Sequence, residues 1–351
     1  MSEQRWFKVS GKGALERLAA TPETLAGPSE GYLWLDFHNP TAAELHVLVE
    51  RLGVHPLSIE DCLDDDQVPK VDDLPTYTFI LFNSYRYADK TLFVDEVDLL
   101  VGKNFLVTVQ GSADGNRLLS QRLDDAIALD AGNVRRGPDF LLHVILDFIV
   151  DQKFAAIEGL QEELDRAEES ILADPDAFRP AALMRLRRHL LVLRKSLFHE
   201  REILVRICRK DSPFISDKAI FHFRDIYDHL ARFFETTEIL REMVSSHMEL
   251  YLSMVNHRMT LLANQTNQVM RRLTFITTIF MPLTLLAGIG GMSEWSMMTG
   301  AENWRVSYPV FLLLMALLGA ANYFVLRRVE IHRGEVGPTR PRKGRRPASS
   351  V

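Results

Sequence analysis

The sequence predicts an α+β domain, then a funnel of long helices, then two C-terminal transmembrane helices. Three observations predict this fold class. Short apolar runs separated by Pro, Asp and Gly occupy residues 30–110, and a stretch with few helix breakers begins near Pro138. Finally, two uncharged runs of about 20 residues lie near the C-terminus, and each is long enough to cross a bilayer.

Four segments of the N-terminal region have the short apolar or alternating pattern typical of strands: YLWLDF, YTFILFNSYRY, VDEVDLLVG and NFLVTVQ. Between the first two, TAAELHVLVERLG has helical spacing. A second short helix is expected from Leu57, directly after His55-Pro56. We expect this α/β domain to cover residues 1–137 and to lie in the cytoplasm.

Residues 138–272 are expected to form a helical stalk or funnel, because helix breakers are rare there. Prolines 175, 180 and 213 divide the stretch into three segments. The last segment, from Phe214 through Met281, would form a rod about 100 Å long. A helix of that length needs neighbours, which are either the preceding helices or copies of itself in an oligomer.

The two uncharged runs predict membrane spans at 273–292 and 306–326. Arg271 and Arg272 precede the first span, whereas the 293–305 loop between the spans is acidic. Cytoplasmic flanks carry an excess of Lys and Arg, so we expect both termini in the cytoplasm. No apolar signal peptide begins the chain, and the prediction is a two-span protein of the inner (plasma) membrane.

Charge is distributed unevenly along the chain. The net charge is −6, yet the tail 327–351 holds eight basic and two acidic residues, which leaves 33 basic and 45 acidic residues before it, a charge of −12. An acidic body argues against nucleic-acid binding and favours a cationic partner, although on charge alone solubility is the favoured explanation. The basic tail is expected to contact anionic lipid headgroups.

Motifs for covalent chemistry are missing from the sequence. It contains no Walker A loop, GxSxG elbow or GxGxxG fingerprint, and Cys62 and Cys208 stand alone. We therefore expect no enzyme activity and no organic cofactor. The run EDCLDDD at 60–66 is more typical of a solvated loop than of a Mg²⁺ site. His222 and His229 lack a further His or Cys nearby in sequence and are interpreted as structural.

One face of the first span carries small and polar residues. Its members, at spacings of 3, 7, 4, 3 and 4, are Asn267, Met270, Thr277, Met281, Thr284 and Gly288. Such a stripe either packs against other helices or lines a water-filled path. Spacing alone leaves both interpretations open.

The segment NQTNQVMRRLTFITTIFMPLTLLAGIGGM resembles the pore helix of the CorA family of divalent-cation channels. Three further segments resemble family segments: HPLSIEDCLDDDQVPKVDDLPTYTFILF, VGKNFLVTVQ and FRDIYDH. The resemblance covers nearly the whole chain up to the basic tail. The family signature at the outer end of the pore helix is Gly-Met-Asn, whereas this chain has Gly291-Met292-Ser293.

This resemblance implies a homopentamer in which the first spans enclose a pore and the second spans form an outer ring. It implies passive influx of Mg²⁺, with Co²⁺ and Ni²⁺ as possible further ions, and a regulatory role for cytoplasmic Mg²⁺. The pore and selectivity residues implied are Gly291, Met292, Ser293, Gly288, Thr284, Met281, Thr277 and Asn267.

The resemblance also assigns roles outside the filter. Met270 and Leu273 are expected to form a hydrophobic gate at the inner mouth, with Met281 as a second ring. Glu294 and Glu302 in the outer loop are expected to attract cations. Asp89 and Asp225 are expected to hold a cytoplasmic divalent ion between neighbouring subunits.

Two alternatives stand beside this interpretation. One is a Zn²⁺ transporter resembling the ZntB branch, and the other is a membrane-anchored metal sensor or scaffold that does not conduct. Met292 favours the CorA side, while Ser293 leaves the identity of the ion open. A non-conducting protein would be expected to carry a charged or bulky plug in the stripe, and the sequence shows none.

Overall fold

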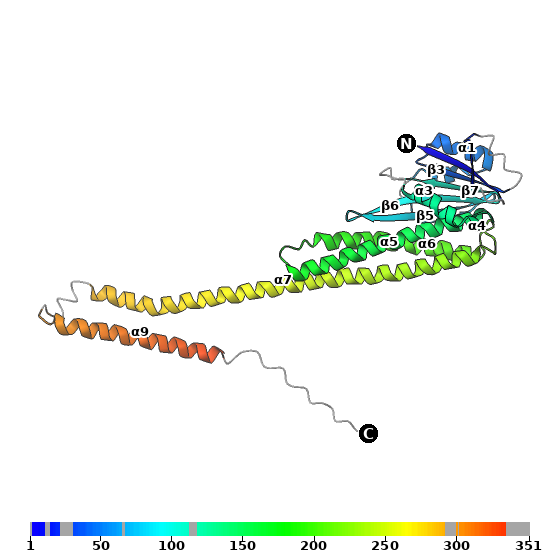
Figure 1. The fold of residues 1–351 in the computed structure, drawn as a ribbon. Helices are drawn as coiled ribbons and strands as arrows, with labels where there is room; N and C mark the ends of the chain where they lie inside the picture. Colours follow the sequence, from blue (N-terminus) through cyan, green and yellow to red (C-terminus); the bar gives the residue numbers. More distant parts are fainter. Residues whose placement is uncertain are drawn as a thin grey trace, which may run out of the picture. The chain divides into compact units, whose positions relative to one another are not determined.

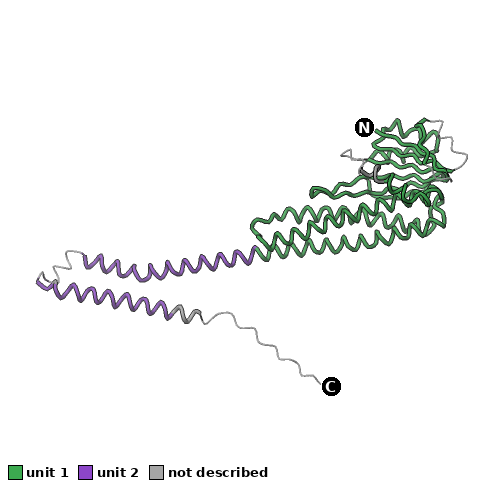
Figure 2. The backbone as a smooth tube through the Cα atoms, in the orientation of Figure 1, with its two compact units in different colours: residues 1–254 green, residues 255–351 purple. Residues whose placement is uncertain are grey.

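The computed structural model describes the ranges 2–10, 15–21, 31–64, 67–111, 118–291, 300 and 302–334. The chain divides into two compact units, residues 1–254 and 255–351 (Figure 2). The 71-residue helix α7 (Ile220–Gly290) belongs to both units and is continuous across their boundary.

The first unit is built on a seven-stranded sheet with the order β2-β1-β3-β7-β6-β5-β4 (Figure 1). Only the pair β3 and β7 is parallel among these neighbours. The strands are β1 (Glu3–Val9), β2 (Leu15–Leu18), β3 (Tyr32–His38), β4 (Val71–Asp73), β5 (Tyr77–Ala88), β6 (Thr91–Gly102) and β7 (Phe105–Gln110). The four strands predicted from sequence are confirmed as β3, β5, β6 and β7.

Alternate residues of the central strands enter two separate cores, as the two-residue period of a strand requires. Leu35 and Phe79 pack with α1 (Ala42–Leu52) and α2 (Pro56–Asp61) on one face. On the other face, Trp34, Ile80 and Phe82 join the larger core. That core is covered by α3 (Leu118–Leu129), α4 (Ala131–Val134), α5 (Pro138–Ala173) and α6 (Ala181–Cys208).

Prolines and a side-chain cap set the limits of the long helices. α5 ends two residues before Pro175, and α6 begins directly after Pro180, as the sequence predicted. The third helix begins at Ile220 rather than at Phe214, because Asp139 accepts hydrogen bonds from the Ser216 N–H (3.0 Å) and hydroxyl (2.5 Å) and holds a turn there. It then continues past Pro282 to Gly290.

A buried ion pair fastens the sheet to the helices. Lys153 of α5 and Glu200 of α6 are fully buried, with Nζ 3.1 Å from Oε1. Lys153 also donates to the carbonyl of Asn83 on β5, and the Asn83 N–H donates to Glu200 Oε1 (3.1 Å). Removing one partner would leave an unpaired buried charge, at a cost of about 3–5 kcal/mol. The pair therefore fixes how β5 sits against both helices.

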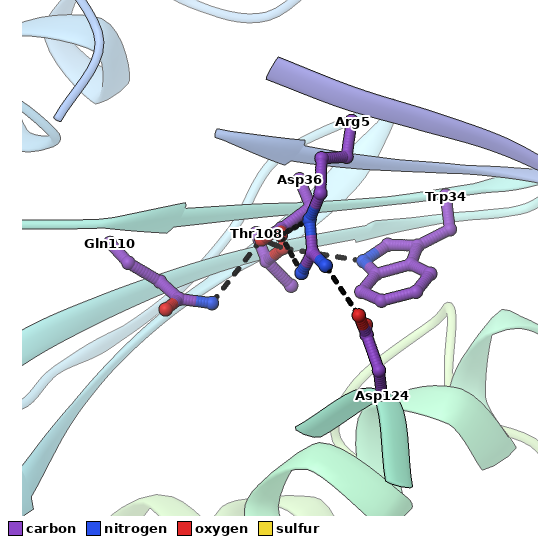
Figure 3. A network of polar contacts seen from close by, with 6 residues as sticks. All are labelled: Arg5, Trp34, Asp36, Thr108, Gln110 and Asp124. Carbon is purple, nitrogen blue, oxygen red and sulfur yellow. Dashed lines mark hydrogen bonds and ion pairs between the residues drawn. The ribbon is translucent and has the colours of Figure 1, made fainter. Parts of the chain in front are cut away.

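A second polar network joins the sheet to α3 (Figure 3). Arg5 donates through Nε (3.0 Å) and Nη2 (2.6 Å) to Asp36 Oδ2, and through Nη1 to Asp124 Oδ2 of α3 (2.6 Å). The Thr108 hydroxyl donates to Asp36 Oδ1 (2.5 Å). Burial raises the pKa of Asp36, while the Arg5 guanidinium opposes that shift. These contacts join residues of the sheet to each other and to α3, so we assign the network to the stability of the fold.

The second unit contains the end of α7 and the helix α9 (Trp304–Gly334). Both helices include an apolar stretch long enough to cross a membrane, and neither stretch is buried within the chain. Two long apolar helices at these positions agree with the two spans predicted from sequence.

Candidate functional site

The two apolar helices contact each other through one face of α7. A Cβ added to Gly290 would stand 2.6 Å from the Phe311 ring of α9, and one added to Gly319 of α9 would stand 3.5 Å from Leu283 Cδ1. Beyond Arg272, the less exposed residues of α7 are Phe275, Ile279, Pro282, Leu283, Leu286 and Gly290. They recur every three or four residues, so they form a single face that α9 partly covers.

The stripe predicted from sequence lies on the opposite face of α7. At about 100° per residue, Thr277, Met281, Thr284 and Gly288 point away from the face that contacts α9. All four are exposed, with Met281 at 76 %, and a Cβ at Gly288 would meet nothing within 4 Å. No described part of this chain covers the stripe.

Hydroxyl groups of the stripe are oriented by the helix backbone. Thr277 Oγ1 donates to the Leu273 carbonyl (3.0 Å), and Thr284 Oγ1 donates to the Phe280 carbonyl (2.8 Å). Each hydroxyl hydrogen is thereby engaged, and the oxygen keeps lone pairs that can accept from water or contact a cation. The face therefore carries two hydroxyl acceptors, although it lies within an apolar helix.

The remaining predicted pore residues are placed as follows. Asn267, Met270 and Leu273 lie nearer the N-terminus of the same helix and are exposed. The Gly291 N–H donates to the Ala287 carbonyl (3.0 Å) and continues the helical bonding. Glu302 is exposed in the turn before α9. Met292, Ser293 and Glu294 lie outside the described residues.

Asp225 lies in an acidic region where α5 approaches the start of α7. Burial raises the pKa of Asp147 on α5, and the carboxylates of Asp151 and Asp225 raise it further, while His229 opposes them. Asp225 itself is exposed. Negative charge from two helices thus collects where a cation can reach it. Within the described ranges, no three His, Cys, Asp or Glu side chains are grouped as a metal site.

Asp89 does not lie beside Asp225 within one chain. It has φ of 50° in the two-residue turn with Lys90 that joins β5 to β6, a turn type that favours Asp, Asn and Gly. Tyr87, next to this turn, hydrogen-bonds Glu163 on α5. Asp225, in contrast, acts electrostatically on Asp147, also on α5. Asp147 and Glu163 are 16 residues apart, or about 24 Å along the helix, so Asp89 and Asp225 lie near different parts of α5.

Two residues near Asp225 were not among the site residues predicted from sequence. His143 and Asp147 lie four residues apart on α5 and therefore share a helix face. This spacing was the only sequence signal for them, and it is common in ordinary amphipathic helices. The acidic run 60–66 is partly engaged in the fold, since Asp61 pairs with Lys70 (2.8 Å).

Known proteins resemble this chain over most of its length. The family model described as "CorA-like Mg2+ transporter protein" matches residues 29–328. The chain is 35 % identical over 273 residues to the cobalt/magnesium transport protein CorA of Thermotoga maritima, covering 77 % of this chain and 74 % of that protein. It is 31 % identical to the putative metal ion transporter YfjQ of Bacillus subtilis, covering 84 % and 88 % of the two chains.

A solved structure has the same fold. The complete CorA magnesium transporter from Methanocaldococcus jannaschii matches with a TM-score of 0.68 at 23 % identity, over 93 % of this chain and 97 % of that one. The match extends over the α/β domain, the long helices and both apolar C-terminal helices. The chain therefore belongs to the CorA family of divalent-cation transporters, inner-membrane proteins with a cytoplasmic domain and two C-terminal spans.

Proposed function

We propose that this chain assembles as a homopentamer in which five copies of α7 enclose a pore for passive influx of Mg²⁺. The observation that carries the proposal is the polar stripe on the face of α7 opposite α9. Small residues and hydroxyl groups gathered on one side of a membrane helix either pack against other helices or line a water-filled path, and no described part of this chain packs on this face. A ring of copies turns every stripe toward a common axis and leaves α9 on the outside.

The proposal divides the chain by function. Residues 1–137 and 138–272 form the cytoplasmic body, 273–292 form the pore helix, and 306–326 form the outer ring. The loop 293–305 faces the outside, and the basic tail 327–351 contacts lipid headgroups. Membrane voltage supplies the driving force, worth about 4.6 kcal/mol for a divalent ion at 100 mV.

Relatives support the choice of ion. The Thermotoga maritima protein is named for cobalt and magnesium transport, and the solved Methanocaldococcus jannaschii protein is named a magnesium transporter. For this chain we therefore propose Mg²⁺ as the main cargo, with Co²⁺ and Ni²⁺ as further cargo. Acceptor oxygens on Thr277 and Thr284 suit hydrated Mg²⁺, which gives up its water reluctantly.

Parts of the stripe have distinct roles in this proposal. Rings of Met270 and Leu273 form the inner constriction, where large apolar side chains exclude water and stop hydrated ions. Gly291, Met292 and Ser293 form the outer filter. Glu302, with Glu294, raises the cation concentration at the outer mouth.

Cytoplasmic Mg²⁺ closes the pore in this proposal. Asp225, strengthened by the nearby charges of Asp147 and Asp151, provides the carboxylate oxygens that Mg²⁺ prefers. An ion held there between subunits would keep the pentamer symmetric and shut. A role for Asp89 stays a prediction, because the turn described above already explains an aspartate at that position.

The test is ion flux into proteoliposomes that contain the purified chain, with Mg²⁺, Co²⁺, Ni²⁺ and Zn²⁺ measured side by side. We expect Mg²⁺ uptake that rises when the interior is made negative by a K⁺ diffusion potential. Uptake of Zn²⁺ in preference to Mg²⁺ would favour the ZntB-like alternative. Absence of flux for all four ions would favour the sensor or scaffold.

A further inference from the structure

Two histidines from different helices form a close pair in the first unit. The rings of His143, in the second turn of α5, and His222, in the first turn of α7, have centroids 4.8 Å apart and planes inclined at 56°. Phe140 packs edge-on against His222 at 5.7 Å, and Phe223 packs edge-on against His143 at 5.9 Å. Aromatic neighbours on both helices thus hold the two imidazoles together.

His143 is more than nine-tenths buried, yet its Nδ1 has no hydrogen-bond partner among the described residues. A buried polar atom without a partner is costly, so such atoms need an explanation. Burial, together with His222, lowers the pKa of His143 to about 4, while Asp130 and Asp225 oppose the shift. At neutral pH this imidazole is uncharged and keeps a lone pair for a ligand.

The surroundings admit a cation. His222 is only half-buried, so solvent reaches the pair from its side. The carboxylates of Asp130 and Asp225 act electrostatically on His143, and they favour positive charge at this place. Two imidazoles that share one metal at 2.0–2.1 Å have ring centroids about 5 Å apart. The observed 4.8 Å is close to that separation, which packed rings also adopt without a metal.

We propose that His143 and His222 form a two-imidazole site for a borderline transition-metal cation such as Co²⁺, Ni²⁺ or Zn²⁺. Imidazole nitrogen suits these ions, whereas Mg²⁺ selects oxygen ligands. Water completes the coordination, since the described residues offer no third grouped ligand. The role of this site depends on the proposed function. It would allow the cytoplasmic body to sense transported transition metals separately from Mg²⁺.

A bound ion would also link α5 to the first turn of α7. Because α7 continues without interruption to Gly290, the linked turn belongs to the same helix as the predicted first span. A transition metal at the pair therefore acts on the helix that we propose to line the pore. It does so through residues other than the carboxylates proposed for Mg²⁺.

The test is equilibrium binding of Co²⁺ to the purified full-length protein in the presence of excess Mg²⁺, read by dialysis and by the visible absorption of nitrogen-bound Co²⁺. We expect one Co²⁺ per chain to be lost, or its affinity to fall at least about tenfold, in His143→Gln and in His222→Gln. His229→Gln is the matched control, because His229 is equally half-buried on α7 and should retain the ion.

Loss of Co²⁺ in His222→Gln, which changes the half-buried member of the pair, supports the site if the unfolding temperature in metal-free buffer is unchanged. Wild-type Co²⁺ binding in both pair variants, or equal loss in His229→Gln, would overturn it. Mg²⁺ flux without Co²⁺ is measured on the same preparations. Absent flux with intact Co²⁺ binding contradicts the proposed function only, and normal flux without Co²⁺ binding contradicts the site only.

Discussion

The ring of Phe311 on α9 lies so close to Gly290 on α7 that a Cβ on the glycine would stand 2.6 Å from it. Together with the contact of Leu283 and Gly319, this fixes which face of α7 the second apolar helix covers. The face left open is the one that carries Met281 and Thr284. These two contacts therefore show that the stripe lies on the face of α7 that points away from α9.

Substituting Gly290 should weaken the packing of the two apolar helices. In Gly290→Ala the new methyl group must displace the Phe311 ring, and overpacking of this kind costs about 1–3 kcal/mol. We expect a lower unfolding temperature of the purified protein in detergent. Gly288→Ala is the matched control, since its methyl group meets nothing within 4 Å. Equal losses in both variants would show that the described contact of α7 with α9 is wrong.

Polar substitutions at the inner constriction should produce a leak. Met270 and Leu273 are 55 % and 53 % exposed on the open side of α7, and serine at both positions would remove the apolar rings that exclude water. We expect the double variant to raise Mg²⁺ influx at high internal Mg²⁺, where we propose that the wild type is closed. Leu313→Ser, at an exposed site of α9, is the control and should not raise Mg²⁺ influx. A double variant that conducts no more than the wild type places the gate elsewhere.

Sequence patterns predicted those elements that carry a strong periodic signal. β3, β5, β6 and β7 have apolar runs, and prolines mark the ends of α5 and α6. Strand β1 and the edge strands β2 and β4 were missed because EQRWFKV, LERL and VDD contain charged residues and few apolar ones. Backbone pairing to neighbouring strands, which no local pattern records, holds them in the sheet.

The candidate site was also predictable only in part, because local spacing shows which residues share a helix face but not what that face contacts. Helical spacing gathered Thr277 and Gly288 on one face, but only the contact with α9 shows that this face is open within the chain. His222 was considered with His229, whereas its ring lies against His143, 79 positions away along the chain. A contact between two helices leaves no trace in local spacing.

Neutralising the acidic region around Asp225 should relieve closure by internal Mg²⁺. In Asp225→Asn the amide keeps the size of the side chain but loses the charge that holds a hydrated divalent ion. We expect flux to persist at the internal Mg²⁺ concentrations at which we propose that the wild type closes. The internal Mg²⁺ concentration for half-inhibition should rise about tenfold or more. Asp228→Asn, an exposed neighbour on the same helix, is the control. Unchanged Mg²⁺ inhibition in Asp225→Asn counts against the regulatory role.

Restoring the family residue at position 293 should sharpen selectivity. Serine offers the same donor and acceptor types as asparagine on a side chain that has two fewer heavy atoms and reaches one bond less far, so its ring would be wider and hold hydrated Mg²⁺ more weakly. Ser293→Asn should lower the Mg²⁺ concentration at half-maximal uptake and increase discrimination against Zn²⁺. Ser296→Asn, in the same loop, controls for the added amide. Identical selectivity in Ser293→Asn and wild type means that position 293 is not the filter.

The central claim, that the face of α7 opposite α9 lines the ion path, is tested most directly by thiol modification during flux. Cysteine is introduced singly at Met281, Thr284 or Leu283 in a background where Cys62 and Cys208 are replaced, and a membrane-impermeant cationic thiol reagent is added. Our account predicts that the reagent blocks Mg²⁺ flux through Met281→Cys and Thr284→Cys and leaves Leu283→Cys conducting. Block of Leu283→Cys with no effect at the other two positions would contradict it.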